Sequence, residues 1–287
     1  MSEPTESLLP GPICSLLLFL ATSAEEKALE EAAQEYGVEF RKDAALTRHL
    51  RFFGLSQDAW RLGTIGGETV VAIGASRDNG RAVMGAHGRL GSAAKAVRCL
   101  AATGAQGILQ IGMAFGIAPG VQQIGDVLVS ALLLPYDNRD VKPNAGRPGY
   151  VNDYMHMNSD EPRPSLLERC RREKERTRFS FNIHIGAMLS GAARIHCAAY
   201  RDELLHSVPH GNEEIVGGEM EGVGLLAASL KPDDSVWCVV KGISDFADEQ
   251  RDNVIKEGRK IAPINAARFV LSGLVNDAKM LAEGKVA

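Results

Sequence analysis

The sequence predicts an α/β fold, a three-layer αβα sandwich with a central mixed, mostly parallel sheet. Strand-like apolar runs alternate with helix-like segments along most of the 287 residues, which is typical of that class. No internal repeat, low-complexity tract or Pro/Gly-rich linker divides the chain. We therefore expect a single domain over residues 13–287, preceded by a flexible N-terminus over residues 1–12.

The first half of the chain opens with an apolar run at 13–21, which predicts a buried strand. Apolar residues then recur at helical spacing over 24–36 and predict a helix. The elements expected next are strands at 69–74 and 81–87, a helix of small residues at 91–102 that Gly104 ends, and strands at 107–112 and 124–134.

The middle of the chain differs, because residues 135–164 are rich in Asn, Asp, Pro, Gly and Tyr. This composition predicts a long loop or lid. The elements expected after it are a charged helix at 165–178, a strand at 182–189, helices at 200–207 and 219–229, strands at 214–217 and 236–243, and a long helix from about 259 to 281.

Composition narrows the class of protein. The formal charge of −4 comes without any basic block, which argues against nucleic acid and acidic membrane surfaces as partners. The five cysteines form no Cys-x-x-Cys pair, so we expect reduced thiols in a cytoplasm and neither disulfides nor zinc. The seven histidines show no metal-ligand spacing. The run at 13–21 is too short to span a bilayer.

Acidic residues follow two of the predicted strands directly. Glu219 and Glu221 come after the strand at 214–217, and Asp245 and Asp248 come after the strand at 236–243. In open α/β folds the carboxyl ends of the strands form the ligand-binding edge. A carboxylate near a buried sheet costs desolvation energy, so it needs a compensating partner or a use.

Three segments together resemble a known family. They are Gly218-Glu-Met-Glu-Gly222, Ile243-Ser-Asp-Phe-Ala-Asp248, and the glycine-rich turn with its following Gly-Asp-Val strand over 108–130. All three resemble signature segments of the nucleoside phosphorylase/nucleosidase superfamily and are most similar to those of 5′-methylthioadenosine/S-adenosylhomocysteine nucleosidase. The resemblance implies a nucleoside phosphorylase-like fold, and it does not extend to the loop at 135–164.

The resemblance also implies roles for individual residues. Asp245 would donate a proton to N7 of a departing purine base, held in place by Ser244, provided that its surroundings keep it protonated. Glu221 would bind the ribose hydroxyls, with Met220 packed against the sugar. The alternative for Ser244 and Asp245 is a helix N-cap pair. Glu219 has two readings of its own, a substrate-binding carboxylate or a capping and supporting one.

The nucleophile is the next question, because phosphorylases of this superfamily hold phosphate with Arg and Ser near the glycine-rich turn. Here the turn contains Gly112, Met113 and Ala114 and offers neither residue type. The chain is also acidic after the first strand. The sequence therefore favours water as the nucleophile, with Glu26 aligned best as its general base and Glu25 as the rival. The alternative for Glu26 is a solvated first-turn acid.

The predicted base pocket departs from the family pattern. In the stretch Ser190-Gly-Ala-Ala-Arg-Ile-His, Ala192 stands where the family has an acid and Arg194 stands where it has an aromatic residue. Arg194, beside Ile195, could stack on a base or reach a phosphate on a nucleotide. The resemblance alone therefore leaves the substrate open.

The main hypothesis is a cytoplasmic purine nucleosidase that acts on an adenine-type nucleoside without a cofactor or metal. By resemblance it would form a homo-oligomer, by default a dimer. A nucleotide nucleosidase of the AMP or ATP type, used in defence or signalling, is one alternative, with Arg194, Arg89 and Arg201 as candidate phosphate ligands. A purine nucleoside phosphorylase and a non-catalytic nucleoside sensor are the others.

Overall fold

The computed structural model describes residues 11–146, 148–155, 160–229 and 235–284. Most of the expected flexible N-terminus, residues 1–10, therefore lies outside the described residues. The helices are α1 (Ser23–Glu35), α2 (Ala44–Phe52), α3 (Ser92–Thr103), α4 (Pro164–Arg176), α5 (Ala198–Ser207), the 3₁₀ helix η1 (Gly222–Ala228) and α6 (Arg251–Ala282). The strands are β1 (Leu16–Phe19), β2 (Arg41–Lys42), β3 (Ala59–Ile65), β4 (Glu68–Ile73), β5 (Arg77–Asp78), β6 (Arg81–Ala82), β7 (Gly107–Phe115), β8 (Val127–Pro135), β9 (Arg139–Pro143), β10 (Tyr150–Tyr154), β11 (Ile183–Ser190), β12 (Ile215–Glu219) and β13 (Trp237–Asp245).

The central sheet has the strand order β12-β11-β8-β13-β7-β1-β4-β3-β2. Its middle is parallel: β1 pairs in parallel with β4 and β7, and β13 pairs in parallel with β7. The pairings β13–β8, β3–β4 and β2–β3 are antiparallel. The predicted α/β class with a mixed, mostly parallel sheet is confirmed.

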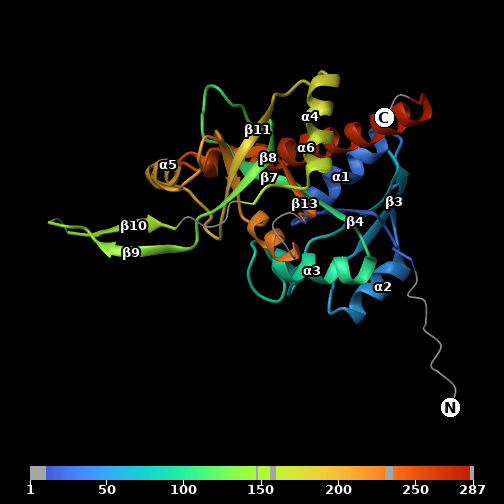
Figure 1. Cartoon of the computed structure of the whole chain (residues 1–287), viewed down its shortest axis with the longest axis horizontal. Helices are drawn as coiled ribbons and strands as arrows, with labels where there is room; N and C mark the ends of the chain where they lie inside the picture. Colours follow the sequence, from blue (N-terminus) through green and yellow to red (C-terminus); the bar gives the residue numbers. More distant parts are fainter. Residues whose placement is uncertain (1–10, 147, 156–159, 230–234, 285–287) are drawn as a thin grey trace, which may run out of the picture.

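Helices cover both faces of this sheet, with α1, α4 and α6 on one side and α2 and α3 on the other (Figure 1). Strand β1 shows how the sequence produces these layers. Leu16 and Leu18 belong to the core beneath α1, α4 and α6, whereas Leu17 and Phe19 belong to the core beneath α2 and α3. A fully apolar strand thus fills both layers, because its side chains alternate between the two faces.

One end of the sheet closes on itself, which positions the site. β12 also meets β7, in an antiparallel pairing of Gly218 with Phe115. A Cβ added at Gly217 would lie only 2.4 Å from the carbonyl oxygen of Phe115, so this close approach requires glycine. The acidic segment that follows β12 is thereby brought to the ends of β7 and β13.

Residues 135–164 differ from the predicted loop, since their described part contains the antiparallel hairpin of β9 and β10, which projects from the body of the molecule (Figure 1). The strands are linked by an ion pair between Lys142 and Asp153 and by a hydrogen bond from Arg139 to Asn152. The Asn, Gly and Pro residues that predicted a loop cluster at positions 144, 146, 148 and 149, between the two strands. Most side chains of the two strands are exposed, so no alternating apolar pattern marks them in the sequence.

Two expected elements are altered in the structure, and further elements appear that were not predicted. The expected strand at 81–87 is reduced to β6, and β2, α2 and β3 lie where no element was predicted. The helix expected at 219–229 is η1, which starts only at Gly222, because Glu219 still belongs to β12. A Cβ at Gly224 would lie 2.1 Å from Oγ of Ser92, so the glycines that weaken an α-helix here allow η1 to pack against α3.

Helix α6 begins eight residues before the expected start at 259. Gly258 and Pro263 discourage a helix in this region of the sequence, yet both lie inside α6. The structure gives Gly258 a reason, because a Cβ there would lie 2.0 Å from the carbonyl oxygen of Ser244. The early start matters, since the first turns of α6 reach the end of β13.

Candidate active site

A cavity of about 340 Å³ lies where β1, β7, β12 and β13 end and where α1 and α6 begin. The predicted site residues that line it are Met113, Ala114, Arg194, Ile195, Glu219, Met220, Glu221, Ser244 and Asp245. The predicted residues Glu26 and Gly112 are not part of the lining, whereas Glu25 is. The tertiary structure therefore brings most of the predicted site together and exchanges one glutamate for its neighbour.

Asp245 occupies the last position of β13 and is 5% exposed. Its Oδ2 lies 2.9 Å from Oγ of Ser244, and its Oδ1 accepts a hydrogen bond of 3.1 Å from the backbone N–H of Ala247. Ala247 adopts a left-handed φ of 53°, which is unusual for a residue with a side chain. Arg251 of α6 adds a cation, with Nε 3.4 Å from Oδ1.

The helix-cap alternative for Ser244 and Asp245 does not describe this arrangement. The N-cap of α6 is Gln250, and no side chain caps that helix. Oγ of Ser244 lies instead within hydrogen-bonding distance of two acceptors, the Asp245 carboxylate and the carbonyl oxygen of Ala114, 3.1 Å away. Ser244 therefore links the end of β13 to the end of β7 and fixes the orientation of the Asp245 side chain.

Glu219 is buried and its carboxylate is occupied by the protein itself. It accepts hydrogen bonds from Oγ of Ser190 at 2.6 Å and from the backbone N–H groups of Glu221 and Gly222 at 2.8 to 2.9 Å. Burial raises the pKa of Glu219, and Lys241 acts in the opposite direction. Although Glu219 lines the cavity, its contacts make it the support of the turn that presents Glu221.

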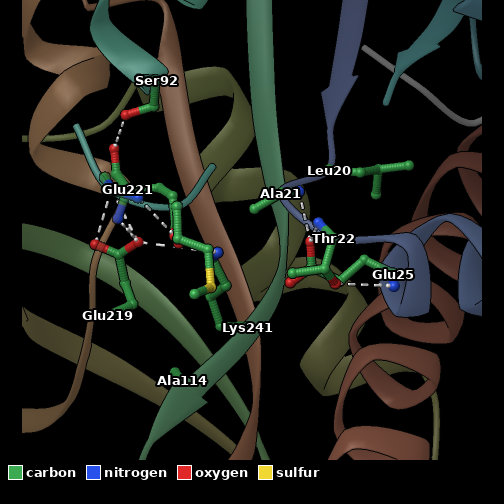
Figure 2. Close-up of polar contacts among 12 residues, drawn as sticks. Leu20, Ala21, Thr22, Glu25, Ser92, Ala114, Glu219, Glu221 and Lys241 are labelled. Carbon is green, nitrogen blue, oxygen red and sulfur yellow. Dashed lines mark hydrogen bonds and ion pairs between the residues drawn. The ribbon is translucent and has the colours of Figure 1, made fainter. Parts of the chain in front are cut away.

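Glu221 is held from two sides by groups far away in the sequence. Its Oε1 accepts a hydrogen bond of 3.2 Å from the backbone N–H of Gly85, and its Oε2 lies 3.1 Å from Nζ of Lys241. Oγ of Ser92 also donates to the carbonyl oxygen of Glu221, at 2.5 Å. Figure 2 shows these contacts around Glu219, Glu221 and Lys241. The carboxylate is thus fixed at the cavity wall while each of its oxygens keeps a further lone pair.

Lys241 was not predicted as a site residue, although a lysine within the apolar run at 236–243 is a visible signal in the sequence. It is fully buried in β13, with Nζ 3.1 Å from Glu221 and 3.9 Å from Glu219. Burial lowers the pKa of Lys241, but the carboxylates of Glu221, Glu25 and Glu219 outweigh it, so the pKa is raised overall. Lys241 is therefore the charged centre of a buried acidic cluster.

Glu25 is the carboxylate that the start of α1 directs into the site. Thr22 is the N-cap of this helix, and Glu25 at the third helical position completes a capping box. Its Oε2 accepts hydrogen bonds from the backbone N–H groups of Ala21 and Thr22, at 2.5 and 3.0 Å (Figure 2). Within the described part of the chain, Oε1 accepts no hydrogen bond. Burial raises the pKa of Glu25, an effect that Lys241 partly offsets and Glu221 reinforces.

Glu26 points elsewhere. Its Oε1 accepts a hydrogen bond of 2.8 Å from the backbone N–H of Ala75, and its Oε2 lies 2.9 Å from Arg77. These contacts tie α1 to the segment after β4, outside the cavity lining. The geometry therefore favours Glu25 over the predicted Glu26 as the residue that could activate water.

Gly112 contributes space even though it does not line the cavity. A Cβ added there would lie 2.2 Å from Oε1 of Glu25 and 3.1 Å from Nζ of Lys241. Any larger residue would displace the Glu25 carboxyl group from its place. The predicted importance of this turn is thus explained by the room that it leaves for a neighbouring carboxylate.

A second buried lysine supports the turn that carries Glu25. Nζ of Lys95 in α3 donates to the carbonyl oxygens of Leu20 and Gly74 at 2.8 Å and lies 4.5 Å from the centre of the Phe19 ring. Burial lowers its pKa to about 8. Because Leu20 and Gly74 directly follow β1 and β4, Lys95 fastens the ends of both strands below the site.

Arg251 and Arg259 reach the cavity from positions that the sequence did not single out. Arg251 and Arg259 of α6 line it, together with Arg194 from the segment after β11. The candidates Arg89 and Arg201 are not in the lining; Arg201 donates instead to the carbonyl oxygen of Phe246, at 2.8 Å. The turns of α6 could be assigned to the site only after β13 and α6 were packed together.

Two broader expectations concern what the chain binds. Among the described residues, no cluster of three or more His, Cys, Asp and Glu side chains could hold a metal ion. Within the same residues, every helix is too short or too polar to cross a membrane.

Comparison of the sequence with known proteins finds a relative but no family model. No protein-family model matches the sequence. A Death domain-containing ATP nucleosidase of Amphimedon queenslandica is 27% identical over 186 residues, which cover 59% of this chain and 34% of that protein. The chain thus spans about a third of the length of this relative.

Solved structures resemble nearly the whole chain. The futalosine hydrolase of Helicobacter pylori superposes with a TM-score of 0.67 at 17% identity, covering 92% of this chain and 98% of that one. The 5′-methylthioadenosine/S-adenosylhomocysteine nucleosidase of Neisseria meningitidis, in complex with methylthio-immucillin-A, gives 0.64 at 19% identity, with coverages of 91% and 99%. The expected nucleoside phosphorylase-like fold is therefore confirmed.

Proposed function

We propose that the protein is an N-glycosyl hydrolase that releases a purine base of the adenine type from a nucleoside. The observation that carries this proposal is that Asp245 and Glu25, contributed by the end of β13 and the start of α1, line one cavity together with Glu221. A pair of carboxyl groups in one cavity is what acid-assisted departure of a base and activation of a water both require. The nucleosidases with the same fold support the same chemistry.

Each carboxyl group has a defined task in this reaction. Asp245 gives its proton to N7 of the base as the bond between N9 and C1′ breaks, so that the base departs neutral. Water forms the new bond to C1′ from the opposite face of the ribose and loses a proton to Oε1 of Glu25. Glu221 accepts hydrogen bonds from the ribose hydroxyls, and these strengthen as the ring becomes positively charged.

The electrostatics of the site suit Glu25 for this task. A general base works best when its pKa is near the operating pH, and burial raises the pKa of Glu25 toward that range. Lys241 limits this rise, and its contact of 3.1 Å with Oε2 of Glu221 holds that carboxyl group in place for the sugar. Water is favoured over inorganic phosphate as the nucleophile, because a phosphate beside Glu25 would be repelled.

The substrate class has two candidates. A methylthioadenosine- or S-adenosylhomocysteine-like nucleoside is supported by the resemblance of the sequence motifs. A nucleotide of the AMP or ATP type is supported by the relative in Amphimedon queenslandica, which is an ATP nucleosidase. Both substrates require the same acid and the same water-activating base.

The proposal is tested by incubating the protein with methylthioadenosine, adenosine, AMP and ATP, each with and without inorganic phosphate, and measuring free base. We expect release that does not depend on phosphate. Asp245→Asn should lower turnover by about 100-fold or more, because it removes the general acid, while the affinity for substrate changes little. Release only in the presence of phosphate would replace the hydrolase with a phosphorylase, and undiminished turnover by Asp245→Asn would remove Asp245 from its assigned role.

A further inference from the structure

The wall of the cavity formed by α6 carries two positive charges, those of Arg251 and Arg259, whereas a base and a ribose are uncharged. Arg251, Ile255 and Arg259 follow one another at intervals of four residues and all line the cavity. Arg251 is engaged with Asp245, as described above. Arg259 is exposed and, within the described part of the chain, forms no ion pair or hydrogen bond.

Arg194 is the second guanidinium without an acidic partner. It is exposed, lines the same cavity, and its contact among the described residues is with the sulfur of Met84, 3.9 Å from Nη2. The four carboxyl groups of the cavity lining are buried and already have donors: Glu25, Glu219, Glu221 and Asp245. The two arginines are therefore not needed to neutralise the site.

Helix α6 places Arg251 and Arg259 at different levels along the cavity wall. Eight residues of α-helix rise about 12 Å, so Arg259 lies that far along the helix axis from Arg251, the arginine that contacts Asp245. Gly258 is pressed against the carbonyl oxygen of Ser244, which holds this stretch of α6 against the site. Because Arg251 is the arginine paired with Asp245, Arg259 is left to bind another part of a ligand whose base lies at Asp245.

The first turn of α1 lines the same cavity as the arginines. Thr22, Ser23 and Ala24 contribute to the cavity wall, and the positive end of the helix dipole adds to the field of the arginines. An ion pair of 2.7 Å between Arg268 and Glu35 fastens α1 to α6 farther along both helices. Both helices thus present their N-terminal ends to the cavity.

We propose that Arg259 and Arg194 bind the phosphate group of a nucleoside 5′-phosphate whose base and ribose occupy the predicted catalytic part of the cavity. This inference rests on the proposed function and makes it more specific. Guanidinium groups bind phosphate oxygens through paired hydrogen bonds, so two exposed ones in the cavity lining favour an anionic 5′ substituent over a neutral thioether.

The test compares Arg259→Met and Arg194→Met with Lys256→Met, which removes an exposed cation of α6 that does not line the cavity. For each variant, kcat/KM is measured with ATP, AMP, adenosine and methylthioadenosine. We expect each arginine variant to lower the ratio of kcat/KM for ATP to that for adenosine by about 10- to 100-fold, through KM, as the loss of a hydrogen bond to a charged group predicts. Lys256→Met should leave the ratio as in the wild type.

Other outcomes overturn the inference in distinguishable ways. A ratio that does not change in either arginine variant, or a wild-type enzyme that prefers adenosine or methylthioadenosine, would show that no phosphate subsite exists. A requirement for inorganic phosphate with every substrate would mean that the arginines hold the nucleophile instead. If no base is released from any substrate, the proposed function fails. Titration calorimetry with ATP then still tests the subsite, which is refuted if Arg259→Met binds ATP as tightly as the wild type.

Discussion

The contrast between Glu25 and Glu26 shows how much depends on one position in a helix. Successive residues of an α-helix are turned by about 100° from one another, so two neighbouring carboxylates cannot face the same cavity. Glu25 folds back over the N-terminus of α1 and reaches the site, while Glu26 forms an ion pair with Arg77. Which of the two carboxylates faces the cavity is therefore fixed by where α1 begins.

Substitution of each glutamate tests this assignment. Glu25→Gln should lower the hydrolytic kcat by about 100-fold or more, because an amide cannot take a proton from water but can still accept the hydrogen bonds from Ala21 and Thr22. Glu26→Gln is the matched control and should retain most of the activity. Steady-state kinetics with the best substrate decides between them. A large loss in Glu26→Gln alone would restore Glu26 as the base.

A signal for Glu25 was present in the sequence. Thr22-x-x-Glu25 has the spacing of a capping box, in which the glutamate at the third helical position reaches back to the backbone of the N-cap. Alignment of the acidic residues with the family motif favoured Glu26 instead. Capping chemistry distinguishes the two because it specifies a direction for the side chain, which a motif match does not.

At the scale of elements, the site is assembled from the ends of strands and the beginnings of helices. Acidic residues at the ends of β12 and β13 lie at the carboxyl edge of the sheet, as the sequence predicts. Side chains from distant elements hold these ends in register. Lys95 of α3 fastens the ends of β1 and β4, and Ser92 of the same helix holds the segment that contains Glu221.

The N-cap of α1 offers a test at this scale. Thr22→Ala removes the side-chain acceptor for the backbone N–H of Glu25, now 3.3 Å away, and should lower the free energy of unfolding by about 1 kcal/mol. It should also lower kcat, because the capping box orients the Glu25 carboxyl group. Thr22→Ser keeps the hydroxyl and is the control. Denaturant unfolding and steady-state kinetics are the measurements, and equal behaviour of the two variants would show that the cap does not position Glu25.

At the scale of the whole molecule, the buried charged groups of the site lower the free energy of unfolding. The carboxyl groups of Glu25, Glu219 and Glu221 are buried around the ammonium group of Lys241. Burial raises the pKa of Glu25 and of Glu219. A carboxyl group whose pKa is raised by folding binds more protons in the folded state, so its contribution to stability falls as the pH rises above the ordinary value of 4.5. Lys241 offsets this effect, and it remains charged at all neutral pH values because its own pKa is raised.

Removal of Lys241 should therefore destabilise the protein in a pH-dependent way. In Lys241→Met the carboxylates lose their cation, and we expect a loss of about 3–5 kcal/mol in the free energy of unfolding at pH 8. The loss should shrink toward pH 5, where the folded protein can protonate these carboxyl groups. Denaturant unfolding at both pH values, with the exposed Lys260→Met as control, checks the prediction. An equal loss at pH 5 and pH 8 would contradict it.

What the sequence determined by itself is the fold class and the chemical character of the site. Apolar periodicity and the acidic residues that follow two predicted strands are patterns of contiguous residues. They can therefore be recognised without knowing how the elements pack. Only the tertiary structure decided that Glu25 rather than Glu26 faces the cavity, that Lys241 pairs with the carboxylates, and that Arg259 lines the cavity whereas Arg89 does not. Each of these depends on the angle and depth at which segments distant in the chain pack together, and short-range patterns carry no record of that geometry.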